Sequence, residues 1–390
     1  MKVLHVIPSI SFNRGGPSFA IRAMTRELVR QGVAVEIATT DDDGPQARMA
    51  VSLEKPSCEN GVTIRYFRRE TGFYTVSSPF ARWLNKHARD YDVIHIHALF
   101  SYTSVIAGRI ARRQKVPYIV RPLGVLNRWG MENRRKHLKA LSFRFLDKPV
   151  AQNAALIHYT SEAEKRAAEL SGISAPSIVL PLGLDLEEFA HLPPREEAWR
   201  KWLLLRERPV ILFLSRIDPI KGLDLLLPAF LQVLAEYPNA ILFIGGTGEE
   251  NFVASLKARA QDLGIAEKII WAGFVKGHDK LLALVAADVF VLPSYSENFG
   301  IAAAEALGAG LPVVISDQVG FAPDVVQTQA GKVTACDESE IAAALSELLG
   351  NEGERRVLGE RGKQLAHEKY SIAANTRQLR SHYERIQQSI

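Results

Sequence analysis

Two glutamates, Glu297 and Glu305, stand eight positions apart within residues 294–305, Ser-Tyr-Ser-Glu-Asn-Phe-Gly-Ile-Ala-Ala-Ala-Glu. The apolar run 288–293 before them predicts a short buried strand, and the alanines after them predict a helix that two glycines end. Glu297 is therefore expected on the loop after the strand and Glu305 on the helix. At ~1.5 Å per helical residue the two carboxylates lie up to ~12 Å apart, so they could hold hydroxyl groups at both ends of one ligand.

The backbone between the glutamates adds an anion site to this arrangement. Amides of Asn298, Phe299 and Gly300 crowd the expected helix N-terminus, where unpaired N–H groups favour a phosphate. Taken alone, a glutamate pair with this spacing is more often the charged face of an ordinary helix. The interpretation therefore needs a second motif.

The segment 215–222, Ser-Arg-Ile-Asp-Pro-Ile-Lys-Gly, supplies one. Arg216 and Lys221 lie on a tight turn after an apolar strand and could aim both cations at one diphosphate. Such a pair would neutralise the charge that develops on a departing diphosphate. Without other motifs, an Arg and a Lys at a strand end are usually surface charges.

Strands and helices alternate from residue 1, and the alternation restarts near residue 209. Nearly continuous apolar strands separated by helices indicate parallel sheets buried on both faces. The chain is therefore predicted to be α/β with two Rossmann-like domains. We expect the domains at 1–190 and 191–370, a linker within 181–208, and a C-terminal helix over 371–390 that packs back on the first domain.

Ligands of two-domain α/β proteins are expected in the cleft, at the carboxyl ends of strands. Several residues with useful chemistry fall at or just after predicted strand ends: Gly15, Gly16, His97, Arg121, Arg216, Lys221, Gly246 and Glu297.

Charge is unevenly spread. Residues 1–190 hold 27 Lys+Arg and 18 Asp+Glu, and the range 109–148 alone holds 12 and 2. Basic and apolar residues interleave there, which favours either a basic amphipathic helix at an anionic membrane or a solvated basic face packed by its apolar side. No nucleic-acid-binding signature accompanies the patch, so a nucleic-acid partner is not expected.

The remaining features indicate a cytosolic, soluble chain, for which we expect no cofactor. Cys58 and Cys336 form neither a metal pattern nor a disulfide framework. The chain runs from Met1 directly into a strand-like segment, and no apolar run is long enough to span a membrane. The acidic run 41–43 falls in a predicted surface loop, so we expect no divalent-metal requirement.

The motif Ser215-Arg-x4-Lys-Gly222, followed by Glu297-Asn-Phe-Gly-x4-Glu305, resembles family 4 of the retaining glycosyltransferases, of the bacterial polysaccharide-biosynthesis type. This resemblance implies the GT-B fold, in which two Rossmann-like domains with parallel sheets face each other across a cleft. It also implies that the first domain binds the acceptor and the second the nucleotide-sugar donor.

The resemblance also implies roles for individual residues. Arg216 and Lys221 match the basic pair on the donor diphosphate, Glu297 the carboxylate on the transferred sugar, and Glu305 the carboxylate on the ribose. Other implied donor contacts are Gly15 and Gly16, Phe274 and Val275 at the nucleobase, and Asn298, Phe299 and Gly300 near the phosphates. Candidate acceptor contacts are Arg14, Arg121, Asn127 and Arg128.

One position departs from the family pattern. Where many relatives have a histidine that touches the transferred sugar, this chain has Leu123. His97 or Arg121 could take over that role, with His97 the catalytic candidate. Alternatively, His95 and His97 point to opposite sides of a buried strand and are each satisfied by a neighbour.

The implied activity is transfer of a hexosyl-type sugar, with retention, from a UDP-sugar, or next from GDP-mannose, to a saccharide or lipid-linked saccharide. We expect a cytoplasmic location, with peripheral contact at the inner membrane face. A sugar-nucleotide hydrolase or epimerase of the same fold is the alternative. A Rossmann oxidoreductase is less favoured because residues 13–18 lack the Gly-x-Gly-x-x-Gly spacing. A two-lobed solute-binding protein would need a signal peptide.

Overall fold

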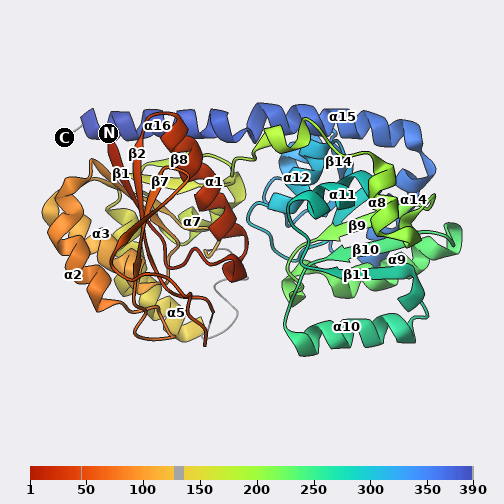
Figure 1. Cartoon of the computed structure of the whole chain (residues 1–390), viewed down its shortest axis with the longest axis horizontal. Coiled ribbons are helices and arrows are strands. Elements are labelled where there is room, and N and C mark those ends of the chain that lie inside the picture. Colours follow the sequence, from red (N-terminus) through yellow and green to blue (C-terminus); the bar gives the residue numbers. More distant parts are fainter. Residues whose placement is uncertain (45, 127–135, 389–390) are drawn as a thin grey trace. The chain divides into compact units, whose positions relative to one another are not determined.

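The computed structural model describes residues 1–44, 46–126 and 136–388. The chain divides into two compact units, the first formed by Met1–Gly183 with Ile372–Ile390 and the second by Leu184–Ser371. In each unit helices cover a largely parallel sheet (Figure 1). The predicted α/β class with two Rossmann-like units is therefore confirmed.

The first unit contains an eight-stranded sheet of order β3-β4-β2-β1-β5-β6-β7-β8. All neighbouring strands are parallel except β3 and β4, which form an antiparallel pair at the edge. The strands are β1 (Lys2–Val6), β2 (Ala34–Thr40), β3 (Pro56–Glu59), β4 (Val62–Phe67), β5 (Val93–His97), β6 (Tyr118–Arg121), β7 (Leu156–Tyr159) and β8 (Ser177–Val179).

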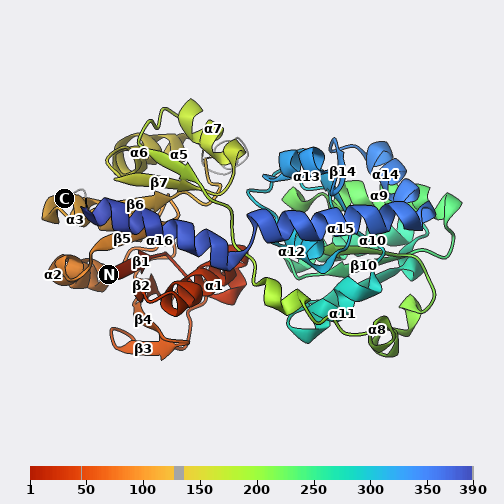
Figure 2. The ribbon, with the colours of Figure 1, turned by 90° about the horizontal axis from the view of Figure 1, so that it is seen from above.

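Helices cover both faces of this sheet because successive strand residues alternate between two apolar cores. The helices are α1 (Gly16–Arg30), α2 (Ser78–His87), α3 (Tyr102–Gln114), α5 (Lys136–Ser142), α6 (Lys148–Gln152), α7 (Glu162–Leu170) and α16 (Ile372–Gln388), with a π-helical turn at Phe143–Asp147. One core includes α2, α3, α6 and α7, and the other includes α1 and α16. Figure 2 shows α16 running along β5 and β6.

The second unit has a six-stranded, fully parallel sheet of order β11-β10-β9-β12-β13-β14. Its strands are β9 (Val210–Leu214), β10 (Ile241–Gly245), β11 (Ile269–Gly273), β12 (Val289–Leu292), β13 (Val313–Ser316) and β14 (Gly331–Thr334). Its helices are α8 (Arg195–Lys201), α9 (Leu223–Glu236), α10 (Glu250–Asp262), α11 (His278–Ala286), α12 (Ile301–Ala309), α13 (Ala322–Thr328), α14 (Glu338–Gly350) and α15 (Glu352–Lys369).

The first boundary between the units lies at Gly183 and Leu184 rather than at the expected 190/191. Residues 184–190 join the second unit because their backbone and side chains are bound there. The amide of Leu184 donates to the carbonyl of Tyr370, 2.7 Å away. Much of the expected linker 181–208 is likewise ordered secondary structure, including α8.

Among the described residues, no helix combines the length and the apolar character that spanning a bilayer requires.

Candidate functional site

The two sequence motifs of the second unit lie side by side at the carboxyl edge of its sheet. They follow β9 and β12, which are neighbouring parallel strands. The amide of Tyr295 donates to the carbonyl of Ile220, 2.9 Å away, and thus joins the two loops directly. Gly222 has a left-handed backbone (φ 72°), and a Cβ there would lie 2.0 Å from the carbonyl oxygen of Pro293. The close approach of the loops therefore requires glycine at 222.

This contact brings Lys221 and Glu297 together. The Nζ atom of Lys221 donates to Oε2 of Glu297, and the two side chains are only 9% and 19% exposed. The backbone of Glu297 is fixed as well, because its carbonyl accepts from the amide of Gly320 at 2.8 Å. A carboxylate and an ammonium are thus held in one place by two short loops.

Arg216 lies on the same loop as Lys221 but in a different environment. Its side chain is 57% exposed, and its Nη1 atom is 3.8 Å from Oδ2 of Asp218. In water a pair at this distance is weak. Arg216 therefore offers a mobile cation for an anionic ligand, whereas Lys221 is already anchored by a carboxylate.

The segment between the two glutamates starts α12 as predicted. Gly300 is the N-cap residue, with φ 90°. Phe299 is 2% exposed, and its ring packs edge to face on that of Tyr370 at 5.2 Å. The buried Phe299 ring thus anchors the loop that leads from Glu297 into α12.

Glu305 lies on α12 and is bound by a lysine that the sequence motifs do not include. Its Oε1 atom is 2.8 Å from Nζ of Lys280, which is also 3.3 Å from Oε2 of Glu188. Burial raises the pKa of Glu305 above its ordinary value, and Lys280 opposes this rise. The pKa of Lys280 is lowered by burial, but the two carboxylates outweigh this effect and raise it above its usual value.

The loops after β10 and β11 lie at the same edge of the sheet. Phe274 is 54% exposed, whereas the side chain of Val275 lies against Gly245. A Cβ on Gly246 would lie 1.8 Å from the carbonyl oxygen of Ser215, so this glycine allows the loop after β10 to pack on the Arg216 loop.

The predicted residues of the first unit gather after β1, β5 and β6. Gly15 has a left-handed backbone (φ 77°) and is the N-cap residue of α1, and Gly16 is the first helical residue. Arg14 forms an ion pair with Asp42, with Nη2 and Oδ2 2.5 Å apart. Asn127 and Arg128 lie outside the described residues.

His95 and His97 lie on the same face of the first sheet, so the expectation that they point to opposite sides was wrong. Residues two apart on a strand share a face, since successive side chains alternate. Their rings stack with centroids 4.2 Å apart. Both are fully buried, as are His5 on β1 and His158 on β7.

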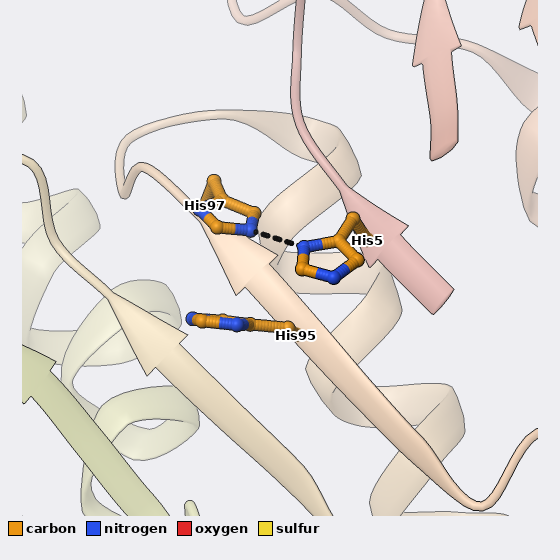
Figure 3. Close-up of side chains that lie close together, drawn as sticks. All are labelled: His5, His95 and His97. Atoms are coloured by element: carbon orange, nitrogen blue, oxygen red, sulfur yellow. Dashed lines mark hydrogen bonds between the residues drawn. The ribbon is translucent and has the colours of Figure 1, made fainter. Parts of the chain in front are cut away.

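Figure 3 shows how His5 meets this pair from the neighbouring strand. Nδ1 of His5 and Nε2 of His97 are hydrogen-bonded at 3.0 Å. Nδ1 of His95 pairs with the hydroxyl of Tyr383 at 2.7 Å, which ties α16 to the sheet. Burial lowers the pKa of His5 to about 3, with a smaller contribution from Arg121, and it also lowers the pKa of the other two rings.

The same cluster offers ligands of the kind that zinc prefers. One nitrogen from each of His5, His95 and His97 lies within 4.8 Å of the others. However, Arg121 is 2% exposed beside these rings, and among the described residues no carboxylate forms an ion pair with it. Burial lowers the pKa of Arg121 to about 10, so the group still carries its charge near neutral pH. A buried positive charge opposes a divalent cation, and we assign no metal to this cluster.

Sequence reasoning missed two buried carboxylates that shape the loops after β5 and β6. Asp147 accepts from the amide of Phe100 at 2.7 Å, and Glu164 accepts from the amide of Gly124 at 2.5 Å. Phe100 has a positive φ (56°), as has Leu123 before Gly124 (62°). Unusual backbone of this kind is held by its surroundings. For Glu164 a signal existed, because Ser161-x-x-Glu164 is a capping-box pattern at the start of α7.

The comparisons with known proteins agree with this layout. Residues 15–183 match the family profile "Glycosyl transferase 4-like domain", and residues 194–365 match "Glycosyl transferases group 1". Together these two matches account for nearly all of both units. The chain therefore carries a glycosyl transferase 4-like domain and a group 1 glycosyltransferase domain.

Curated relatives of this glycosyltransferase include enzymes with inositol-containing substrates in their names. The GDP-mannose-dependent alpha-(1-6)-phosphatidylinositol monomannoside mannosyltransferase of Mycolicibacterium smegmatis is 29% identical over 56% of this chain and 59% of its own. The D-inositol 3-phosphate glycosyltransferase of Corynebacterium urealyticum is 26% identical over 94% and 89%. Its counterpart from Xylanimonas cellulosilytica is 33% identical over 54% and 52%. The chain thus spans between about half and nine-tenths of the length of these relatives.

Solved structures share the GT-B fold of the glycosyltransferase. Sucrose-phosphate synthase from Thermosynechococcus elongatus superposes with a TM-score of 0.81 at 20% identity, over 100% of both chains. Anabaena HepE in complex with UDP and glucose gives 0.80 at 18% identity, over 98% of this chain and 99% of its own. At these identities the likeness establishes the fold alone.

Proposed function

We propose that this glycosyltransferase moves a hexosyl group from a nucleotide diphosphate sugar to a hydroxyl of a saccharide or lipid-linked saccharide. The Lys221–Glu297 ion pair is the observation that carries the proposal. It places a cation suited to a diphosphate beside a carboxylate suited to sugar hydroxyls, both largely shielded from water. Glu305, on the helix that follows, would take the ribose.

Transfer is proposed to retain the anomeric configuration without a divalent metal. Lys221 and the exposed Arg216 would stabilise the negative charge on the leaving diphosphate, which is the work that a metal does in other enzymes. In a front-face substitution the departing phosphate takes the proton of the acceptor hydroxyl. This scheme needs positive charge at the phosphate and no carboxylate nucleophile.

For the donor we keep the order predicted from sequence, a UDP-sugar first and GDP-mannose second. A relative with 29% identity is named as GDP-mannose-dependent, and a solved structure of the same fold contains UDP-glucose. Both bases therefore belong in the first donor screen. Phe274 and Val275 are proposed to contact the base.

Acceptor binding is assigned to the first unit. Gly15 and Gly16 would approach the donor diphosphate, and Arg14 would contact the acceptor. Contact of His97 or Arg121 with the transferred sugar stays a prediction. Both side chains are almost fully buried. Asn127 and Arg128, outside the described residues, likewise stay predictions.

Peripheral contact with an anionic membrane is proposed through the end of the basic stretch 109–148. Leu141 and Phe145 are 58% and 60% exposed, and the guanidinium of Arg144 lies 5.9 Å from the Phe145 ring centroid. Exposed apolar side chains next to basic ones suit the headgroup region of an anionic bilayer.

Flotation with anionic vesicles at low salt should recover the wild type but less of a Leu141→Ser, Phe145→Ser variant. Leu170→Ser, which changes an exposed leucine on α7, is the matched control. No flotation of the wild type would contradict membrane contact, and equal flotation of all three proteins would contradict contact through Leu141 and Phe145.

The proposed activity is tested by incubating the protein with UDP-glucose, GDP-mannose or ADP-glucose and a panel of saccharide and lipid-linked acceptors. Mass spectrometry should find an acceptor that carries one added hexosyl unit, formed by the wild type and not by Glu297→Gln. A parallel reaction without acceptor separates the alternatives. Free sugar released equally fast without acceptor would indicate a hydrolase, and no turnover of any donor would contradict the proposal.

A further inference from the structure

Lys280 is the centre of a three-residue charge network on the second unit. Its Nζ atom lies 2.8 Å from Oε1 of Glu305 and 3.3 Å from Oε2 of Glu188. Lys280 and Glu305 are each 18% exposed, whereas Glu188 is 50% exposed. One ammonium therefore serves two carboxylates, and the more buried of the two lies closer.

Three different elements supply these side chains. Lys280 comes from α11, Glu305 from α12, and Glu188 from the short helix Leu186–Phe189, through which the chain enters the second unit. That short helix is seated on α12, because a Cβ on Gly308 would lie 3.1 Å from the Phe189 ring. The Nζ atom of Lys280 also lies 5.9 Å from the centroid of this ring. Packing thus holds the network in place.

We propose that Lys280 is a positioning residue of the donor site, which keeps Glu305 ionised and oriented for a donor hydroxyl, while Glu188 competes for the same ammonium. This inference rests on the proposed function, since it takes Glu305 as the ribose ligand. A carboxylate accepts hydrogen bonds from a hydroxyl through both oxygens, but once protonated it loses part of that capacity. Lys280 engages one oxygen and leaves the other for the ligand.

The electrostatics of Glu305 support this assignment, because Lys280 and Glu188 shift the pKa of its carboxyl in opposite directions. Burial raises the pKa of the carboxyl, Lys280 lowers it, and Glu188 raises it. On the α15 side, Lys363 packs on α12, against Gly310 at the far end of the helix. Removing Lys280 should therefore raise the pKa of Glu305 further, and removing the charge of Glu188 should lower it.

The test is the dissociation constant of UDP-glucose or GDP-mannose, whose phosphates do not titrate between pH 5 and pH 9, measured by titration calorimetry over that range. In the wild type, binding should weaken as the pH falls through the pKa of Glu305. In Lys280→Met this weakening should begin at higher pH, and the affinity in acid should fall about tenfold for each pH unit by which the profile moves. Glu188→Gln should move it to lower pH, and Lys280→Arg should restore the wild-type profile. Glu305→Gln should abolish this pH dependence.

The outcomes separate this inference from the proposed function. If the wild type binds neither nucleotide sugar at any pH, the proposed function fails and the inference with it. If the wild type binds but Lys280→Met and Glu188→Gln leave the profile unchanged or move it in the same direction, the inference alone is overturned. Persistence of the acid limb in Glu305→Gln would also overturn it. Should Lys280→Met fail to fold, Glu188→Gln decides, because an unchanged profile there contradicts the competition for Lys280.

Discussion

Lys221 and Glu297, which lie 76 positions apart in the sequence, form a largely buried ion pair between two loops. Neither side chain has another described partner at this edge of the sheet. The pair depends on Gly222, whose missing side chain lets one loop approach Pro293 on the other. Predictions about activity therefore begin with these two side chains.

Replacing Glu297 with Gln or Lys221 with Met should lower kcat for sugar transfer by roughly 100- to 1000-fold, as expected when one preorganised electrostatic contact is lost. Steady-state kinetics measures this loss, and circular dichroism checks the fold. Glu352→Gln, at an exposed position on α15, is the matched control and should keep full activity. Wild-type turnover in either site variant would refute the assignment.

Replacing Glu305 with Gln should instead act on donor affinity. Because Glu305 is assigned to the ribose, we expect the donor KM to rise about tenfold, which corresponds to ~1.4 kcal/mol, with kcat little changed. A fall in kcat at unchanged KM would indicate that Glu305 contacts the transferred sugar and Glu297 the ribose.

Gly222→Ala should lower the free energy of unfolding by more than the cost of a left-handed backbone alone. A non-glycine residue at positive φ costs about 1–2 kcal/mol, and here the new Cβ would also meet the Pro293 carbonyl. Gly264→Ala is a close control, because φ is 71° there and no atom lies within 4 Å of the new Cβ. Urea unfolding should show the larger loss for Gly222→Ala, together with loss of transfer. Equal losses would mean that the loop contact is not tight.

The histidine cluster should make the first unit less stable in acid. The unfolded chain binds a proton at each histidine near pH 6.5, whereas burial keeps the pKa of folded His5 at about 3. The contribution of these rings to the free energy of unfolding is therefore complete above pH 6.5. It falls as the pH drops toward 3, by up to about 1.4 kcal/mol per pH unit for each such ring.

Urea unfolding at several pH values, with amide exchange followed in β1 and β5, measures this slope. His5→Leu should flatten it, whatever its effect at neutral pH. His87→Gln, which changes an exposed histidine at the end of α2, should leave the slope unaltered. An identical slope in wild type and His5→Leu would show that the cluster is not the cause.

Chelation should leave transfer intact, since the proposed chemistry uses Lys221 and Arg216 where other enzymes use a metal. Activity after exhaustive EDTA treatment and dialysis is expected to match that of untreated protein. Loss of activity that added Mg²⁺ or Mn²⁺ restores would contradict metal independence.

Much of the second unit was predictable because its strands are short, apolar and followed by motifs. Parallel strands end at one edge of a sheet, so the positions of Lys221 and Glu297 after neighbouring strands indicated a shared site. Their direct pairing was not predictable, since it depends on the order of strands and on the contact of Gly222 with Pro293. Lys280 was missed for a similar reason, because its partners Glu305 and Glu188 lie 25 and 92 positions away.

In the first unit, two errors had signals in the sequence. The β3–β4 hairpin was overlooked because β3 is short and exposed, although Asn60-Gly61 at its turn is a strong hairpin signal. The common face of His95 and His97 follows from the two-residue period of a strand. By contrast, the contact of His95 with Tyr383, 288 positions away, could come only from the packing of α16.

Binding of a nucleotide diphosphate sugar to the second unit through Lys221 is measured by equilibrium titration of wild type and Lys221→Met with UDP-glucose, GDP-mannose and ADP-glucose. We expect saturable binding of at least one donor to the wild type and at least about tenfold weaker binding to the variant. Failure of all three to bind the wild type, or equal binding by both proteins, would contradict this expectation.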